Sequence, residues 1–152
     1  MKLKNKIAVI TGASTGIGRA IAVKLASEGT KTLLLARSKD GLEETLKLVE
    51  QAGSKGKNFC IDLRSVEEIK KFAQNIKGSE GEIDILVNVA GIWHSKGKAF
   101  SGIEFADYST DEILDTYAVG LIAPTILSHE LVPLMKQGSK IINISGTFES
   151  GA

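Results

Sequence analysis

The chain alternates short apolar runs with longer segments of helical period. Five of the runs are rich in Val, Ile and Leu without regular polar alternation, which is typical of strands buried on both faces of a parallel sheet. The expected strands are Ile7–Thr11, Thr32–Ala36, Asn58–Ile61, Ile83–Asn88 and Lys140–Ile144. The expected helices lie near Ile17–Glu28, Leu42–Ala52, Val66–Ile76 and Thr110–Met135.

Polar residues mark where two of these helices begin. Ser65 and Ser109 are each followed three residues later by a glutamate, which is the spacing of a capping box. Strands that alternate with helices predict an α/β fold with a doubly wound parallel sheet, covered by helices on both faces. A chain of 152 residues without an evident linker predicts one domain.

The composition limits which partners and which cellular location are expected. A formal net charge of +1 gives no electrostatic reason to expect nucleic acid or an anionic membrane as a partner. The apolar run after the basic N-terminus is too short for a signal peptide, and we expect no window to reach the length that spans a bilayer. The single Cys60 excludes an internal disulfide and is expected to be a small buried residue on its strand. A cytoplasmic protein is therefore expected.

The strongest motif is Thr-Gly-Ala-Ser-Thr-Gly-Ile-Gly at positions 11–18, between an expected strand and an expected helix. A dinucleotide-binding turn needs glycine for a tight turn, for close approach of the backbone to pyrophosphate, and for helix–sheet packing. The helix start then offers free N–H groups and its positive dipole end to phosphate. The residues expected to bind cofactor here are Gly12, Ser14, Thr15, Gly16, Ile17 and Gly18.

The spacing of this turn resembles the short-chain dehydrogenase/reductase family, whose motif reads Thr-Gly-x-x-x-Gly-x-Gly. Further motifs follow in the family's order, with Asp62-Leu63 after the third strand and Asn88-Val89-Ala90-Gly91 after the fourth. The resemblance covers the whole chain. It implies that residues 1–152 are an NAD(P)-binding Rossmann domain with strand order 3-2-1-4-5, incomplete because it stops after the fifth strand.

The end of the second strand bears on which cofactor is bound. NAD-preferring family members carry an aspartate where this chain has Ala36, and that carboxylate binds a ribose hydroxyl. The next residue is Arg37, whose guanidinium is suited to a phosphate, so Arg37 and Ser38 are expected to favour NADP, with NAD less favoured. The alternative is that Arg37 is a solvated side chain beside Lys39.

The other two motifs imply further cofactor contacts. The resemblance places Asp62 and Leu63 against the adenine, with the carboxylate accepting a hydrogen bond from the exocyclic amine. Alternatively, Asp62 is an ordinary strand-end residue. Asn88 is expected to tie neighbouring strands together, while Ala90 and Gly91 let the backbone pass close to the cofactor.

The family's catalytic residues are harder to find. Its proton donor belongs to a Tyr-x-x-x-Lys pair, which this chain lacks and which is expected beyond Ala152. Gly146 stands where the family has its catalytic serine, so either Ser145 or Thr147 takes over that role, with Ser145 as the candidate, or the chemistry is altered. Tyr117 stands at the family's helical asparagine, where packing against neighbours is the expected role and reaching the site through its hydroxyl is the alternative. Val89 replaces the second asparagine of the fourth-strand motif.

The resemblance implies an oxidoreductase that passes hydride between NADP(H) and a small alcohol or carbonyl substrate. The complete protein is expected to form a homodimer or homotetramer, whereas the 152-residue chain alone is expected to be inactive. The departures at Val89, Tyr117 and Gly146 leave open a module that binds or senses NADP(H) without turnover. A site for S-adenosylmethionine is a third reading, disfavoured by the glycine spacing.

Overall fold

The computed structural model describes residues 2–92, 94–95, 98–99 and 104–145. Its centre is a five-stranded parallel sheet in the order β3-β2-β1-β4-β7, which confirms the predicted α/β fold and the strand order 3-2-1-4-5. The strands of this sheet are β1 Ile7–Thr11, β2 Lys31–Ala36, β3 Gly56–Cys60, β4 Ile83–Asn88 and β7 Met135–Asn143. The helices are α1 Gly16–Ser27, α2 Lys39–Gln51, α3 Val66–Ser79, α4 Thr110–Tyr117 and α5 Ala123–Leu131.

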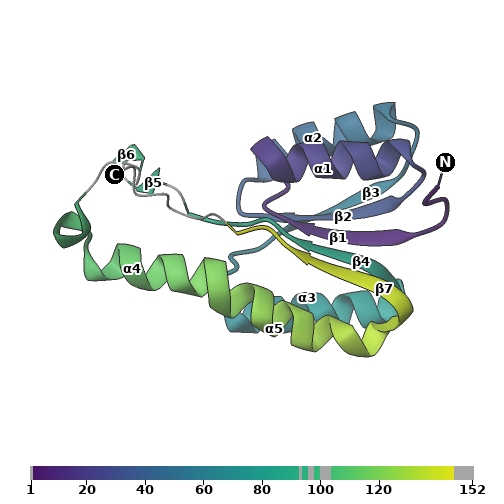
Figure 1. Cartoon of the computed structure of the whole chain (residues 1–152). Helices are drawn as coiled ribbons and strands as arrows, with labels where there is room; N and C mark the ends of the chain where they lie inside the picture. The colour runs from purple at the N-terminus through teal and green to yellow at the C-terminus, as the bar shows by residue number, and fades with distance from the viewer. Residues whose placement is uncertain (1, 93, 96–97, 100–103, 146–152) are drawn as a thin grey trace.

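The helices cover both faces of the sheet, with α1 and α2 on one side and α3, α4 and α5 on the other (Figure 1). Each face has its own buried core, and neighbouring residues of one strand serve different cores: Leu33 and Leu35 face α3 and α5, whereas Leu34 faces α1 and α2. The inner strands β1 and β2 are buried at every position after the first, and burial on both faces explains why their apolar runs lack polar alternation.

The bounds of the edge strand β3 and the exposure of Cys60 differ from the prediction. The strand spans Gly56–Cys60, begins two residues before the predicted run, and leaves Ile61 outside. Cys60 is exposed, so the prediction of a buried core residue is wrong. The reason is position: β3 has a single neighbour in the sheet and lies at its edge, where one flank of the strand faces solvent.

The long helix predicted at Thr110–Met135 is a succession of helical types. The α-helices α4 and α5 flank a π-helical turn at Ala118–Ile122, and a 3-10 turn at Val132–Leu134 ends the segment. A π turn inserts one extra residue into the hydrogen-bonding ladder and rotates the following face relative to the preceding one. The buried residues of α5 are Ala123, Leu127 and Leu131, whereas α4 buries none.

The helical segment Thr110–Leu134 is long and apolar enough to cross a membrane by length and composition. The expectation that no segment reaches that length is therefore wrong, because the polar first turn of the helix precedes a second half that is almost uncharged. One such helix is weak evidence, since core helices of soluble proteins pass the same test. Here the face carrying Ala123, Leu127 and Leu131 packs in the core.

The last strand starts five residues earlier than predicted, at Met135. Its pairing with β4 is irregular: Met135 lies opposite Ile83, and regular pairing resumes with Lys140 opposite Ile85. Beyond β7 the sheet has no further strand in the part of the chain that is described, and Ile141, Ile142 and Ile144 are 39%, 44% and 42% exposed.

The connection from β4 to α4 contains two small elements. A two-residue hairpin pairs β5 His94–Ser95 with β6 Lys98–Ala99. A 3-10 turn at Phe105–Asp107 follows it and leads into α4.

Glu80 fastens the end of α3 to two strands. Its side chain is 3% exposed, and its carboxylate pairs with Lys31 of β2 at 2.5 Å and with Lys57 of β3 at 2.9 Å. Burial raises the pKa of Glu80, but the hydrogen bonds from the two lysines outweigh it and hold the pKa below its ordinary value of 4.5. A group whose pKa is lower in the folded state stabilises the fold above its ordinary pKa.

We predict that Glu80→Gln lowers the free energy of unfolding at pH 7 by roughly 1–3 kcal/mol, because two lysines lose their buried counter-charge. The contribution of Glu80 is lost as the pH falls below 4.5, so the variant and the parent should converge in acid. Urea unfolding at pH 7 and at about pH 3 measures both effects. Glu67→Gln, which removes an exposed pair with Lys71, is the control and should change stability by less than about 0.5 kcal/mol. An equal loss at both pH values would contradict the prediction.

Candidate dinucleotide-binding site

The glycine turn joins β1 to α1, and each of its glycines meets a different constraint. Gly12 has a φ of +65°, and a Cβ there would lie 3.0 Å from the Cα of Ala90. A Cβ on Gly18 would lie 2.2 Å from the carbonyl oxygen of Gly12, so the helix packs directly on the turn. Gly16 has a φ of +54°, and a Cβ there would have no neighbouring atom within 4 Å, so this part of the turn faces open space.

The N-terminus of α1 is free to meet an anion. Its N-cap Thr15 makes no side-chain capping bond, and the first turn contains no acidic residue. The helices α2, α3 and α4 are instead capped by serines and carry acidic residues in their first turns. Thr15, Gly16 and Ile17 are exposed around this helix end. Free N–H groups and the positive end of a helix dipole are what a phosphate group binds.

The turn is supported from behind by residues that the sequence did not single out. Arg19 donates through Nη2 to the carbonyl oxygen of Ser14 and through Nε to the Thr45 hydroxyl at 3.0 Å. Thr45 is fully buried and donates to the carbonyl oxygen of Ala13 at 2.8 Å. The signal was present, because Thr45 is a polar residue on the core-facing side of α2, between Leu42 and Val49.

The first turn of α2 presses against the same loop. A Cβ on Gly41 would lie 2.9 Å from the Cβ of Ser14, so this glycine permits the close approach. Ser38, which was expected to bind cofactor, caps α2 by accepting from the N–H of Gly41 at 3.2 Å. Arg37 next to it is exposed, and its side chain forms no hydrogen bond or ion pair with any described residue.

The Asp62-Leu63 motif lies in the tight connection from β3 to α3. The carboxylate of Asp62 accepts hydrogen bonds from the backbone N–H and the guanidinium of Arg64, at distances of 2.6 to 3.1 Å. The hydrogen bond from the Arg64 side chain lowers the pKa of Asp62 below its ordinary value, and the nearby charge of Arg37 adds to that effect. Leu63 is 7% exposed. The carboxylate is therefore an ionised acceptor at the same edge of the sheet as Arg37.

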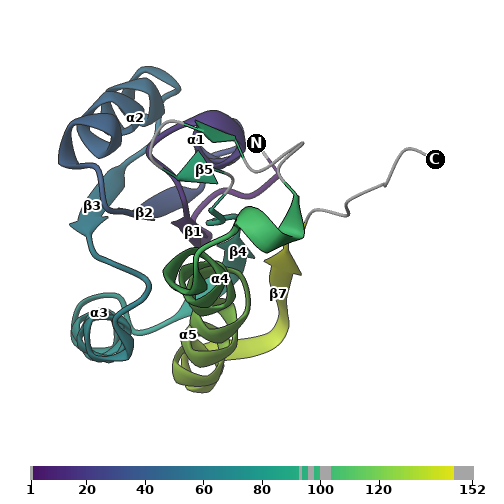
Figure 2. The same ribbon diagram turned by 90° about the vertical axis from the view of Figure 1, so that its left-hand side faces the viewer.

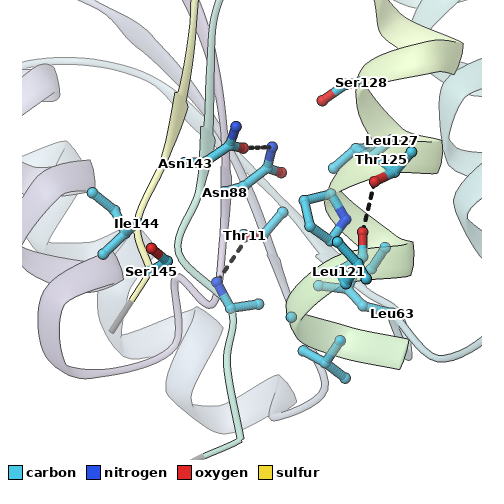
Figure 3. Close-up of a pocket in the computed structure, with 15 residues that line it drawn as sticks. Thr11, Leu63, Asn88, Leu121, Thr125, Leu127, Ser128, Asn143, Ile144 and Ser145 are labelled. Carbon is cyan, nitrogen blue, oxygen red and sulfur yellow. Dashed lines mark hydrogen bonds between the residues drawn. The ribbon is translucent and has the colours of Figure 1, made fainter. Parts of the chain in front are cut away.

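The ends of β1, β4 and β7 are joined through side chains. The Thr11 hydroxyl accepts hydrogen bonds from the N–H groups of Val89 at 2.9 Å and Ala90 at 3.0 Å. Asn88 donates through Nδ2 to the side-chain oxygen of Asn143 at 2.8 Å, which confirms that Asn88 ties neighbouring strands together (Figure 3). The side-chain oxygen of Asn88 is buried and has no protein partner among the described residues.

A cavity of about 390 Å³ opens beside these strand ends, between the sheet and the helical segment 118–128 (Figure 3). Among the residues lining it are Thr11, Leu63, Asn88, Ala90, Asn143 and Ser145. The structure therefore brings Ser145 beside the cofactor-motif residues Asn88 and Ala90. Gly146 and Thr147 lie outside the described residues.

Tyr117, at the position of the family's helical asparagine, does not pack inside the molecule. Its side chain is 59% exposed, and it is not among the residues that line the cavity. The expectation of a packing role is wrong, because Tyr117 belongs to α4, a helix that buries none of its residues. This helix projects beyond the sheet (Figure 1) and is seen end-on in Figure 2.

Comparison with known proteins decides the family. The family profile described as short chain dehydrogenase matches residues 6–149. The chain belongs to the short-chain dehydrogenase family. It is 39% identical over 145 residues to the uncharacterized oxidoreductase YxbG of Bacillus subtilis, covering 95% of this chain and 51% of that protein. The chain thus spans about half the length of the curated relatives it matches.

Two solved members of this family resemble the structure. A metagenomic short-chain oxidoreductase in complex with NADP superposes with a TM-score of 0.86 at 32% identity, covering all of this chain and 67% of that one. An NAD⁺-bound xylitol dehydrogenase gives a TM-score of 0.83 at 25% identity, covering 94% of this chain and 54% of that one. Related folds therefore carry either nicotinamide dinucleotide. The uncapped α1 and the open space at Gly16 fit such a cofactor.

We predict that Thr11→Val lowers the free energy of unfolding by roughly 2–4 kcal/mol, because the N–H groups of Val89 and Ala90 both lose their acceptor. Denaturant unfolding measures the change. The matched control is Thr116→Val on the exposed side of α4, where the loss should stay below about 0.5 kcal/mol. Equal effects of the two substitutions would show that the Thr11 hydroxyl does not hold the strand ends together.

We predict that Gly18→Ala destabilises the fold by at least about 1–3 kcal/mol, because the added methyl group would collide with the backbone of Gly12. Gly78→Ala is the control, since this position in α3 has open space and should gain about 0.5–1 kcal/mol from better helix propensity. Thermal melts of both variants provide the comparison. A Gly18→Ala variant as stable as the parent would rule out the tight helix–turn packing.

Proposed function

We propose that this chain forms the cofactor-binding part of an NADP(H)-dependent oxidoreductase that transfers hydride between the cofactor and a small alcohol or carbonyl substrate. The observation that carries the proposal is the combination of an uncapped α1 with an exposed Arg37, unpaired among the described residues, at the same edge of the sheet. A bound nicotinamide dinucleotide supplies the hydride. The chain's own residues supply binding and orientation.

The first set of proposed contacts binds the phosphate groups of the cofactor. Gly12, Ser14, Thr15, Gly16 and Ile17 surround the start of α1, where backbone N–H groups would hold the pyrophosphate, and Gly18 lets the helix approach the turn. Arg37 would pair with the 2′-phosphate of NADP, with Ser38 beside it at the start of α2. Ala36 offers no carboxylate for the ribose hydroxyls of NAD, which supports the preference for NADP.

The remaining motifs would contact the adenine and the other parts of the cofactor. Asp62 would accept a hydrogen bond from the exocyclic amine of adenine, and Leu63 would pack on the ring. Asn88 holds the end of β4 in place, and the backbone at Ala90 lies beside the glycine turn. Gly91 would let the backbone after it pass close to the cofactor. With these contacts the cofactor would lie across the carboxyl edge of the sheet, where ligands of this fold class bind.

Catalysis requires a residue that orients the carbonyl and a proton donor. Among the described residues, Ser145 is the candidate for the first role. Ser145 lines the cavity and could orient a carbonyl by hydrogen bonding. Proton donation is assigned to a Tyr-x-x-x-Lys pair, which neither Tyr108 nor Tyr117 provides. The hydride-transfer proposal therefore concerns a polypeptide of the relatives' length.

The second candidate function is a non-catalytic module that binds NADP(H). The departures from the family pattern at Val89, Tyr117 and Gly146 favour it. NADPH oxidation in the presence of a carbonyl substrate, measured with a polypeptide of the relatives' length, separates the two candidates. Turnover would support the oxidoreductase, whereas cofactor binding without turnover would support the module.

The proposed setting is a homodimer or homotetramer in the cytoplasm. Large apolar side chains are exposed along the helical segment 110–134 and on β7, and an exposed apolar surface of this kind is suited to association. The most exposed aliphatic ones are Leu114, Leu121, Ile122, Val132 and Ile142.

We predict that Arg37→Asp weakens NADPH binding by about 10- to 100-fold and leaves NADH binding equal or tighter, because a carboxylate repels the 2′-phosphate and can accept from a ribose hydroxyl. Fluorescence titration of both nucleotides gives the ratio of the two dissociation constants. Lys47→Asp makes the same charge change further along α2 and should leave the ratio unaltered. If Arg37→Asp also leaves it unaltered, Arg37 does not bind the phosphate.

A further inference from the structure

Arg64 lies between two elements that the cofactor motifs do not connect. Its Nε and Nη2 atoms bind the carboxylate of Asp62, and its Nη1 donates to the carboxylate of Asp115 at 2.7 Å. Asp62 follows β3, and Asp115 lies on α4, 51 residues after Arg64 in the sequence. One guanidinium thus bridges the connection after β3 to α4.

The bridge does not shape the backbone of the loop. That backbone has its own hydrogen bonds: Asp62 donates from its N–H to Glu68 at 2.7 Å, and its carbonyl oxygen accepts from the N–H of Ser65 at 2.9 Å. The Arg64 and Asp115 side chains are each 40% exposed, and pairs with that much solvent add little to stability. A planar guanidinium held between two carboxylates instead fixes the orientation of the carboxylate that it binds through two nitrogens.

The loop that carries Asp62 and the turn that follows α4 both reach the cavity through neighbouring residues. Residues on both sides of the bridge line one cavity, Leu63 from the loop and Val119 and Gly120 from the turn after α4. The backbone N–H and the guanidinium of Arg64 donate to both oxygens of the Asp62 carboxylate, so the acceptor positions that remain have a fixed orientation. An ionised carboxylate accepts hydrogen bonds and donates none. It therefore pairs with a purine that carries an amine at carbon 6 and repels one that carries an oxygen there.

We propose that Arg64 is a positioning residue for base recognition: held by Asp115, it aims the Asp62 carboxylate so that the site selects adenine over a 6-oxopurine. The inference rests on the proposed contact between Asp62 and adenine. Arg64 acts through Asp62 and needs no contact with the cofactor. The role of Asp115 links base selection to α4, the helix that precedes the π turn at Ala118–Ile122.

The test compares NADPH with its hypoxanthine counterpart, in which an oxygen replaces the amine at carbon 6. Dissociation constants for the two are measured by fluorescence titration with the chain and its variants. Arg64→Gln should weaken NADPH binding about 3- to 10-fold and change binding of the hypoxanthine analogue less than about twofold, as expected for one misdirected hydrogen bond. Asp115→Asn should shift the ratio in the same direction by a smaller factor.

Two further variants separate positioning from charge and from general damage. Arg64→Lys keeps the charge but loses the fork, so it should lose discrimination as Arg64→Gln does; full discrimination in Arg64→Lys would overturn the positioning role. Lys71→Gln removes an exposed cation of an ion pair within α3 and should leave both dissociation constants unchanged. Thermal midpoints of all variants confirm that they fold, since a loss of fold would weaken both nucleotides equally.

Asp62→Asn distinguishes failure of this inference from failure of the proposed function. If Asp62→Asn loses discrimination and Arg64→Gln keeps it, Asp62 reads the base without help from Arg64, and the inference is wrong. If Asp62→Asn keeps discrimination, the proposed adenine contact is wrong and the inference falls with it. A parent chain that binds neither nucleotide would overturn both.

Discussion

The close approach of the β1 end to the β4 end is the constraint on which the candidate site depends. Gly12 passes so near to Ala90 that no side chain fits between them, and the Thr11 hydroxyl accepts from the N–H groups of the two residues that follow β4. The turn after β1 and the loop after β4 are thereby joined into one surface, which forms one wall of the cavity. The cavity opens against this wall, with Asn88 and Asn143 joining β4 to β7 (Figure 3).

Three arginines around this wall differ in their partners. Arg19 binds the protein itself, through the carbonyl oxygen of Ser14 and the hydroxyl of Thr45 behind the glycine turn. Arg64 is shared between Asp62 and Asp115 at the other end of the site. Arg37 has no such partner among the described residues, and a cation left exposed beside a free helix N-terminus is suited to an anionic ligand.

The apolar surfaces point outward from the described part of the chain. The outer edge of β7 and the outer face of the helical segment 110–134 expose large aliphatic side chains, although the inner face of the same segment packs in the core. The chain spans about half the length of its curated relatives. Burial of such surface is favourable in proportion to its area, so these faces are suited to contact with further protein surface.

Local sequence was sufficient to predict the parallel sheet and the place of the glycine turn, and the family resemblance added the strand order. Strands buried on both faces require unbroken apolar runs, and a tight turn with a positive φ requires glycine, so both leave signals that need no knowledge of distant contacts. Serine caps at Ser65 and Ser109 are equally local, because the bonds they make lie three residues away.

Other features depend on neighbours from distant parts of the chain, so only the tertiary structure determines them. Cys60 is exposed because β3 is an edge strand, and Tyr117 is exposed because α4 projects beyond the sheet. The supporting roles of Arg19 and Arg64 involve partners up to 51 residues away, which only the fold brings within hydrogen-bond distance. A periodic pattern records which side of an element is buried, but it carries no information about which residue lies opposite.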